Sequence, residues 1–195
     1  MRKTEKIWYH LLNYERNEEL LGRIAHIPYL DLAIIFSIKE EEEGPRRMIT
    51  QEEAKDLERL EELAAVNTPR SCPACFHPLD DVIRGLEAEM GIMLHREPSR
   101  LPMYLLTNAQ KFLGASVILY PGLLHRLGSQ LEEDFYILPS SVHECILVPE
   151  SAGCGREELR EMVRSVNDTQ VPPQEILSYQ VYYYSVREDC IYSQD

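Results

Sequence analysis

Hydrophobic and polar positions follow two distinct periods along this chain, and the clearest run has period two. Leu32, Ile34 and Phe36 recur at every second position, and the residues between them are apolar as well. Alternate side chains of a strand point to opposite faces of a sheet, so a run that is apolar on both faces is buried on both. The segment therefore predicts an interior strand, with Asp31 at its start.

Several other segments place apolar residues three or four positions apart, the spacing of an amphipathic helix. Thr50 and Glu53 form a capping-box pattern that opens one of them, and Pro121 suits the first turn of another. The predicted helices cover residues 5–23, 50–67, 80–90, 121–131 and 156–166, with a short helical turn at 173–177. The inward face of the helix at 80–90 is predicted to consist of Val82, Ile83, Leu86 and Met90.

Shorter apolar runs predict the remaining strands, and several of these are joined by short connections. The run 40–45 is acidic and ends in Gly-Pro, so it predicts a solvated turn between a hairpin's two strands. The segment 68–79 is rich in proline and predicts an irregular connector. The predicted strands cover residues 46–49, 103–107, 115–120, 135–138, 145–148 and 179–186.

Strand pairs with helices inserted between them favour an α+β fold. We expect an antiparallel or mixed sheet of about six to seven short strands, with about four to five helices packed on it. A doubly wound parallel fold would need a helix between nearly every pair of strands. The length of 195 residues predicts a single domain, in which residues 1–24 form an N-terminal helix and 68–79 the connector.

The composition narrows the function classes. The net charge is −13 and the isoelectric point about 4.9, so phosphate backbones and anionic membrane surfaces are repelled, and neither nucleic acid nor a membrane is an expected partner. No run approaches the roughly 18 apolar residues of a membrane span, and the start lacks a signal peptide's apolar core. A cytoplasmic protein is expected, whose five cysteines are free thiols.

The stretch Ser140–Glu144 gathers hydroxyl, imidazole and carboxylate groups between two apolar runs. Ser141, His143 and Glu144, helped by Asn108 or Lys111, are candidates for acyl-transfer or hydrolytic chemistry. Period two puts Ser141 and His143 on one face and turns Glu144 to the other, and no nucleophile elbow is present. The alternative is a strand–turn–strand loop whose polar side chains bond to backbone groups.

Cys72, Cys75 and His77 form a C-x-x-C-x-H cluster that could supply three ligands of a zinc site. A fourth ligand at a matching spacing is missing. A thioredoxin-like redox pair needs a strand before the motif and a helix directly after it, whereas this motif follows a helix and a proline-rich loop. These three residues are therefore weak metal candidates, and no cofactor is predicted.

Several blocks of the chain resemble an uncharacterised bacterial family, known as domain of unknown function family 5688. The resemblance is to members of the gut Firmicutes type. The resemblance covers nearly the whole chain, and the later blocks are specific. The blocks are NYERNEELL (Asn13–Leu21), IPYLDLAIIF (Ile27–Phe36), AAVNTPR (Ala64–Arg70), MYLLTNAQKFLGASVILYPGLL (Met103–Leu124), FYILPSSVHECILVPE (Phe135–Glu150) and LREMVRSVNDTQVPPQEILSYQVYYY (Leu159–Tyr184).

The resemblance implies a bacterial cytoplasmic protein and carries over no activity, cofactor or catalytic residue. Family members are expected to extend further at the N-terminus than this chain does. The segment around Cys72 and Cys75 departs from the family pattern, which weakens the zinc and redox interpretations. The matching blocks include the polar and aromatic residues Asp31, Asn67, Asn108, Lys111, Tyr120, Ser140, Ser141, His143, Glu144 and Asn167.

Two functions from different classes remain. The leading hypothesis is a non-enzymatic protein-interaction or regulatory module with a protein partner or self-association. It rests on the absence of a catalytic motif, on the acidic composition and on the tyrosine-rich strand at 179–186, which could form an exposed edge. The alternative is a hydrolase or metal-dependent enzyme that uses the Ser140–Glu144 cluster, which requires those side chains to converge.

Overall fold

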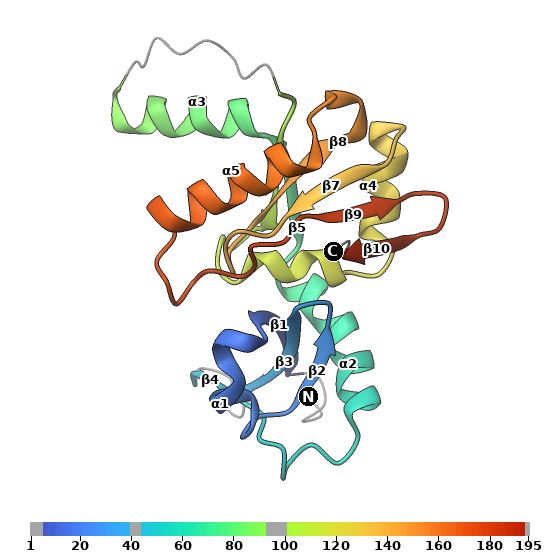
Figure 1. Ribbon diagram of the computed structural model, residues 1–195. Coiled ribbons are helices and arrows are strands. Elements are labelled where there is room, and N and C mark those ends of the chain that lie inside the picture. The colour runs from blue at the N-terminus through green and yellow to red at the C-terminus, as the bar shows by residue number, and fades with distance from the viewer. Residues whose placement is uncertain (1–5, 40–43, 93–100, 194–195) are drawn as a thin grey trace.

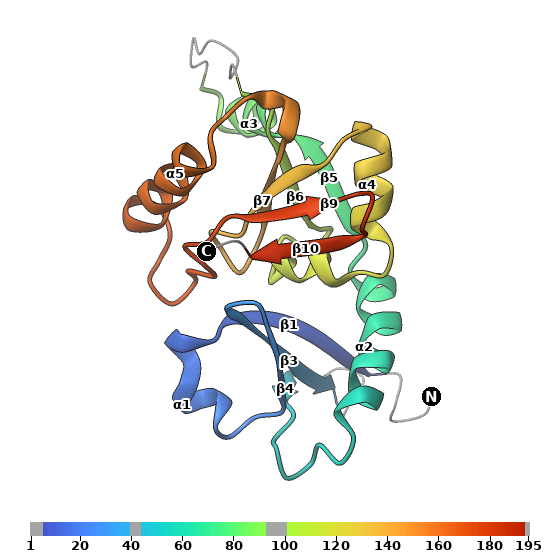
Figure 2. The ribbon, with the colours of Figure 1, turned by 45° about the vertical axis from the view of Figure 1, so that its right-hand side comes forward.

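A computed structural model describes residues 6–39, 44–92 and 101–193, and within them the strands form two antiparallel sheets (Figure 1, Figure 2). The first sheet contains β1 (Ile7–Asn13), β2 (His26–Tyr29), β3 (Leu32–Lys39) and β4 (Arg46–Met48). The second has the order β10-β9-β7-β8-β6-β5 and contains β5 (Ala74–Pro78), β6 (Tyr104–Asn108), β7 (Phe135–Leu138), β8 (Cys145–Pro149), β9 (Tyr182–Ser185) and β10 (Cys190–Ser193). The predicted α+β class is confirmed, with the strands divided between two sheets.

The helices are α1 (Glu18–Leu21), α2 (Leu57–Ser71), α3 (Leu79–Met90), α4 (Leu123–Leu131) and α5 (Arg156–Thr169), with 3-10 turns η2 (Glu15–Asn17), η3 (Gly114–Leu119) and η4 (Glu150–Ala152). α3, α4 and α5 lie beside the second sheet, whereas α1 lies beside the first and α2 packs on β1 (Figure 1). Along β7 the side chains alternate between two cores: Phe135 and Ile137 face the larger one, Tyr136 and Leu138 the smaller one under α5. α2 joins the first sheet to β5 (Figure 2).

The predicted helix over residues 1–24 is wrong for residues 7–13, which form β1. In this strand Tyr9 pairs with Phe36 and Leu11 with Ile34 of β3. The spacing of apolar residues in this segment also fits a helix, but almost every position from 7 to 13 is buried, so both faces need cover. β3 supplies a ladder partner that no local pattern reveals, and only Glu18–Leu21 becomes α-helical.

The predicted irregular connector at 68–79 is also wrong. α2 continues through Pro69 and ends at Ser71, and β5 follows almost at once. β5 is the last strand of its sheet, where proline is tolerated because one edge of the strand needs no ladder partner. Pro78 therefore closes this strand without breaking the pairing with β6.

The predicted strand at 115–120 is the 3-10 turn η3, in which every residue from Gly114 to Ile118 is buried. A uniformly apolar run cannot be assigned by periodicity alone. The backbone of Ala115 bonds to the carbonyl of Val142, outside any sheet. The predicted strand at 179–186 shortens to β9 and is followed by β10, and the predicted helical turn at 173–177 is a non-helical turn with a single bridge at Ile176.

Other predictions are confirmed within a few residues. β3 is buried on both faces, β4 pairs back on it, and α3, α4 and α5 lie where the apolar spacing places them. Residues 40–43 of the predicted turn lie outside the described residues. Thr50 and Glu53 exchange hydrogen bonds as a capping box does, but they close a separate turn. Asp56 is the residue that caps α2, by accepting from the backbone of Arg59 at 2.9 Å.

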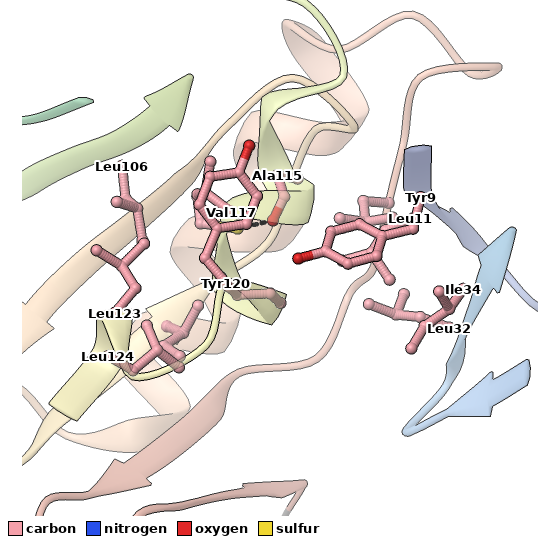
Figure 3. Close-up of a cluster of buried hydrophobic side chains, with 14 of the residues drawn as sticks. Tyr9, Leu11, Leu32, Ile34, Leu106, Ala115, Val117, Tyr120, Leu123 and Leu124 are labelled. Atoms are coloured by element: carbon pink, nitrogen blue, oxygen red, sulfur yellow. Dashed lines mark hydrogen bonds between the residues drawn. The ribbon is translucent and has the colours of Figure 1, made fainter. Parts of the chain in front are cut away.

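A single cluster of buried side chains extends from the first sheet into the second. Figure 3 shows Tyr9 and Leu11 of β1 opposite Tyr120 and its neighbours. A hydrogen bond accompanies this packing: Asn13 Nδ2, at the end of β1, donates to the carbonyl of Leu177, in the segment before β9, at 2.9 Å. The two sheets therefore share one apolar core.

This shared core predicts that the chain unfolds as one unit. Trp8, the only tryptophan, lies in β1 of the first sheet, whereas the helical signal comes largely from α3, α4 and α5 around the second. Tryptophan fluorescence and far-ultraviolet circular dichroism should give coincident urea midpoints. Two resolved transitions, with fluorescence changing first, would contradict a single unit.

Candidate functional site

Ser141 and His143 lie in the loop between β7 and β8 and are each engaged by a backbone amide. Ser141 Oγ accepts from the N–H of His143 at 3.0 Å, a short-range turn that stabilises the loop. His143 Nδ1 lies 3.1 Å from the backbone nitrogen of Leu113, which donates to it. In the neutral ring the proton is therefore on Nε2, which faces Glu175 Oε2 at 3.6 Å.

These contacts do not pair the Ser141 hydroxyl, as a nucleophile, with the His143 imidazole, as its base. Ser141 is only 4% exposed and forms a bridge with Ile176. Its hydroxyl binds the backbone of His143, and the imidazole binds Leu113 instead. Glu144 lines a groove under α3, yet Ser141 and His143 both lie close enough to oppose the rise in the pKa of its carboxyl that burial causes, so it is not separated from them as the period of two predicts.

The groove under α3 is a cavity of about 480 Å3 between that helix and the β5–β6 edge of the second sheet. Period two places Cys75 and His77 of β5 on this face. Five of the candidate site residues from the sequence meet here, because Asn108, Lys111 and Glu144 line the same groove. The remaining lining residues are Asp81, Val82, Gly85, Leu86, Glu89, Leu105, Thr107 and Ala109.

The groove is acidic. Asp81, Glu89 and Glu144 contribute carboxylates, and Lys111 contributes an ammonium from an exposed position. Burial raises the pKa of Glu144, and the nearby imidazole of His143 opposes that shift. The charged form of Glu144 is thus held in a partly desolvated place.

Replacing Glu144 with glutamine should raise stability at pH 7. The pKa of Glu144 is higher in the folded than in the unfolded protein, so ionisation destabilises the fold as pH rises through both values. Below the unfolded pKa both side chains are neutral, and the advantage of Glu144→Gln should vanish. Urea midpoints at pH 7 and in mild acid test this; a variant that is less stable at pH 7 would contradict it.

The Cys72-Pro-Ala-Cys75 segment is split between two environments. Cys72 is buried, and its carbonyl accepts from the hydroxyl of Tyr120 at 2.7 Å, whereas Cys75 reaches the groove with His77. Across residues 6–39, 44–92 and 101–193, no three histidine, cysteine or acidic side chains gather into a metal-binding group. The same part of the chain contains no helix that could cross a membrane.

Comparison with known protein families identifies the family to which the chain belongs. A family model described as a family of unknown function, DUF5688, matches residues 2–186. The chain belongs to the DUF5688 family. No curated protein and no solved structure matches it. The resemblance stated from the sequence blocks is thereby confirmed at the level of the family.

Several polar residues in the DUF5688-like blocks make structural hydrogen bonds. Asn67 Nδ2 donates to the carbonyl of Ile7, and Asn167 Nδ2 donates to that of Ser178. Asn108 accepts from and donates to its own loop at Gln110 and Phe112. These side chains fasten strands, helices and loops to one another, so their place in the blocks does not point to chemistry.

Sequence reasoning missed a second cavity, between the two sheets. It measures about 400 Å3, and Tyr9, Tyr29, Tyr120 and Tyr184 line it from separate parts of the chain. Tyr9 was predicted on a helix, which gives no reason to place it beside the other three. A local pattern could not have found this cavity because it exists only where the sheets meet.

Proposed function

We propose that this DUF5688 protein is a non-enzymatic interaction module that binds an apolar, basic segment of a partner protein in the groove under α3. The observation that carries the proposal is the exposed apolar face of that helix. Free cysteines throughout the described chain support the cytoplasmic location expected from the sequence. The hydrolase alternative has no comparable support, because the Ser141 hydroxyl accepts from the backbone of His143 and hydrogen-bonds to Glu144, whereas the imidazole Nδ1 accepts from the backbone of Leu113.

α3 is amphipathic, yet none of its residues is buried. Leu86 is 45% exposed and Met90 63% exposed, although their spacing predicts that they face inward. Val82 and Leu86 border the groove, which extends this apolar surface onto Leu105 of β6. Apolar area left in water costs roughly 25 cal/mol per Å2 and commonly marks an interaction surface.

The negative charge of the groove favours a positively charged partner segment. The groove contains more carboxylates than cations, and the whole chain has a net charge of −13. Complementary charge accelerates encounter and disfavours acidic competitors. Asp81 already pairs with Arg84, so the partner's cation belongs near Glu89. A partner segment with apolar anchors for Leu86 and Val82 and with lysine or arginine near Glu89 meets both requirements.

Selection from a displayed random peptide library against the full chain tests the proposal. We expect enriched peptides to combine apolar residues with lysine or arginine and to bind more weakly at high salt. Leu86→Asp should weaken their binding by about tenfold or more. Val66→Asp is the matched control, since Val66 is 53% exposed on α2, outside the groove.

Two results would overturn the proposal. The first is a selection that enriches no peptide, or only peptides that Leu86→Asp binds as well as the wild type does. The second is a concentration-dependent dimer in light scattering that Leu86→Asp abolishes and Val66→Asp preserves. That dimer would assign the groove to a second copy of the chain instead of a foreign partner.

A further inference from the structure

The cavity between the two sheets has the composition of a small-molecule site. Its volume of about 400 Å3 falls in the usual range of ligand pockets, roughly 300–1,000 Å3. Tyrosines from β1, from β9 and from the segment after η3 face it, with Ile34, Ile118 and Leu124 as apolar wall. This cavity is separate from the groove under α3, so it supports an inference of its own.

The hydroxyl oxygen of Tyr9, which lines this cavity, is buried and has no hydrogen-bond partner within the described residues. The Tyr9 side chain is 2% exposed. Figure 3 shows that hydroxyl extending from β1 toward the segment of Tyr120. An unsatisfied buried hydroxyl costs on the order of 1–3 kcal/mol, so a buried tyrosine usually has a partner.

The hydroxyl groups of Tyr120 and Tyr184, which line the same cavity, already have partners. Tyr120 donates to the carbonyl of Cys72 at 2.7 Å, and Tyr184 donates to the carboxylate of Asp189. Burial raises the pKa of Tyr9, and Tyr120 and Glu61 raise it further, so the phenol keeps its proton. A neutral phenol oxygen can accept a hydrogen bond from a ligand.

The charged groups at this cavity are both acidic. Glu61 of α2 and Asp189 of the β9–β10 turn line it, and the described lining includes no lysine, arginine or histidine. A bound anion would face two carboxylates with no counter-charge. A cation would be attracted by both of them and by the faces of the tyrosine rings.

We propose that the cavity between the sheets binds a small primary ammonium ion with an apolar body. An ammonium N–H donates to the oxygen of Tyr9, and the Glu61 carboxylate balances the charge. The apolar body packs against Ile34 and Leu124, and the tyrosine rings add cation–π attraction. The three requirements together describe an arylalkyl or alkyl amine.

Titration calorimetry on the full chain tests the ligand class. The probes are phenethylamine and hexylamine, compared with 2-phenylethanol and 3-phenylpropanoate, which keep the apolar body and change only the head group. We expect both amines to bind and to raise the melting temperature, the alcohol to bind more weakly, and the carboxylate not to bind. Failure of both amines at millimolar concentration, or equal binding of the carboxylate, would overturn the proposal.

Two variants test the residues. Tyr9→Phe and Glu61→Gln should each weaken amine binding by about tenfold, the effect of one hydrogen bond to a charged group. Tyr9→Phe removes an unsatisfied hydroxyl, so the unliganded melting temperature should not fall. Tyr14→Phe, outside the cavity, is the control and should bind as the wild type does. Unchanged affinity in both cavity variants would refute the assignment.

Discussion

Replacing Gly114 with alanine should lower the free energy of unfolding by about 3 kcal/mol, an effect at the upper end of overpacking in a core. The new Cβ would collide with the carbonyl of His143 and the side chain of Thr107, and would lie 2.9 Å from the backbone nitrogen of Asn108. Two of these three atoms belong to the backbone and cannot rotate away. Urea unfolding of the purified variant measures the loss.

Gly85→Ala is the matched control for this substitution. A Cβ at Gly85 meets nothing within 4 Å, and this glycine lies in the middle of α3. Alanine is a better helix former than glycine, so this variant should gain about 0.5–1 kcal/mol. Similar stability of the two variants would contradict the close approach of η3 to β6 and the β7–β8 loop.

Asp31→Ala should destabilise the protein by about 3 kcal/mol, because two hydrogen bonds to a carboxylate are lost together. Asp31, at the start of β3, accepts from Ser178 Oγ at 2.6 Å and from the hydroxyl of Tyr182. Tyr182 is fully buried in the second sheet. Burial and Asp31 raise the pKa of Tyr182, so it remains a donor and loses its acceptor in the variant.

A double-mutant cycle separates this contact from other effects of the substitution. Tyr182→Phe removes the donor, and the pair Asp31→Ala with Tyr182→Phe should cost less than the sum of the two single variants. Glu52→Ala, at an exposed turn position, should change stability by less than about 0.5 kcal/mol. Strict additivity of the two single variants would show that Asp31 does not hold the sheets together through Tyr182.

Local patterns predicted some elements well and failed at others for an identifiable reason. The pattern predicts β3 correctly, because this strand is apolar on both faces, whereas for residues 7–13 it predicts a helix and the structure has a strand. The apolar side chains of β3 and of residues 7–13 must all be covered by other parts of the protein. Only the pairing of residues 7–13 with β3 shows that residues 7–13 form an extended strand. The pattern predicts a strand where the structure has η3, because a short apolar run has no distinguishing period.

The candidate sites show the same division. Period two predicts that Glu144 faces away from Ser141 and His143, but the structure keeps both close enough to oppose the burial-driven rise in the pKa of Glu144, which also lines the groove under α3. The meeting of Glu144 with Lys111 and His77 could not be predicted, because it depends on where α3 crosses the β5–β6 edge. The exposure of Leu86 was likewise hidden, since helical spacing marks an apolar face without showing what covers it.

The α+β class, the acidic character, the buried strand β3 and the resemblance to the DUF5688 family all follow from the amino-acid sequence. Which side chains share a cavity depends on how the elements pack in three dimensions. Tyr9 and Tyr184 come from opposite ends of the chain and line one cavity because two sheets pack against each other. The period of apolar residues shows which face of a helix or strand a side chain lies on. Whether side chains from different elements converge on one cavity depends on contacts between those elements.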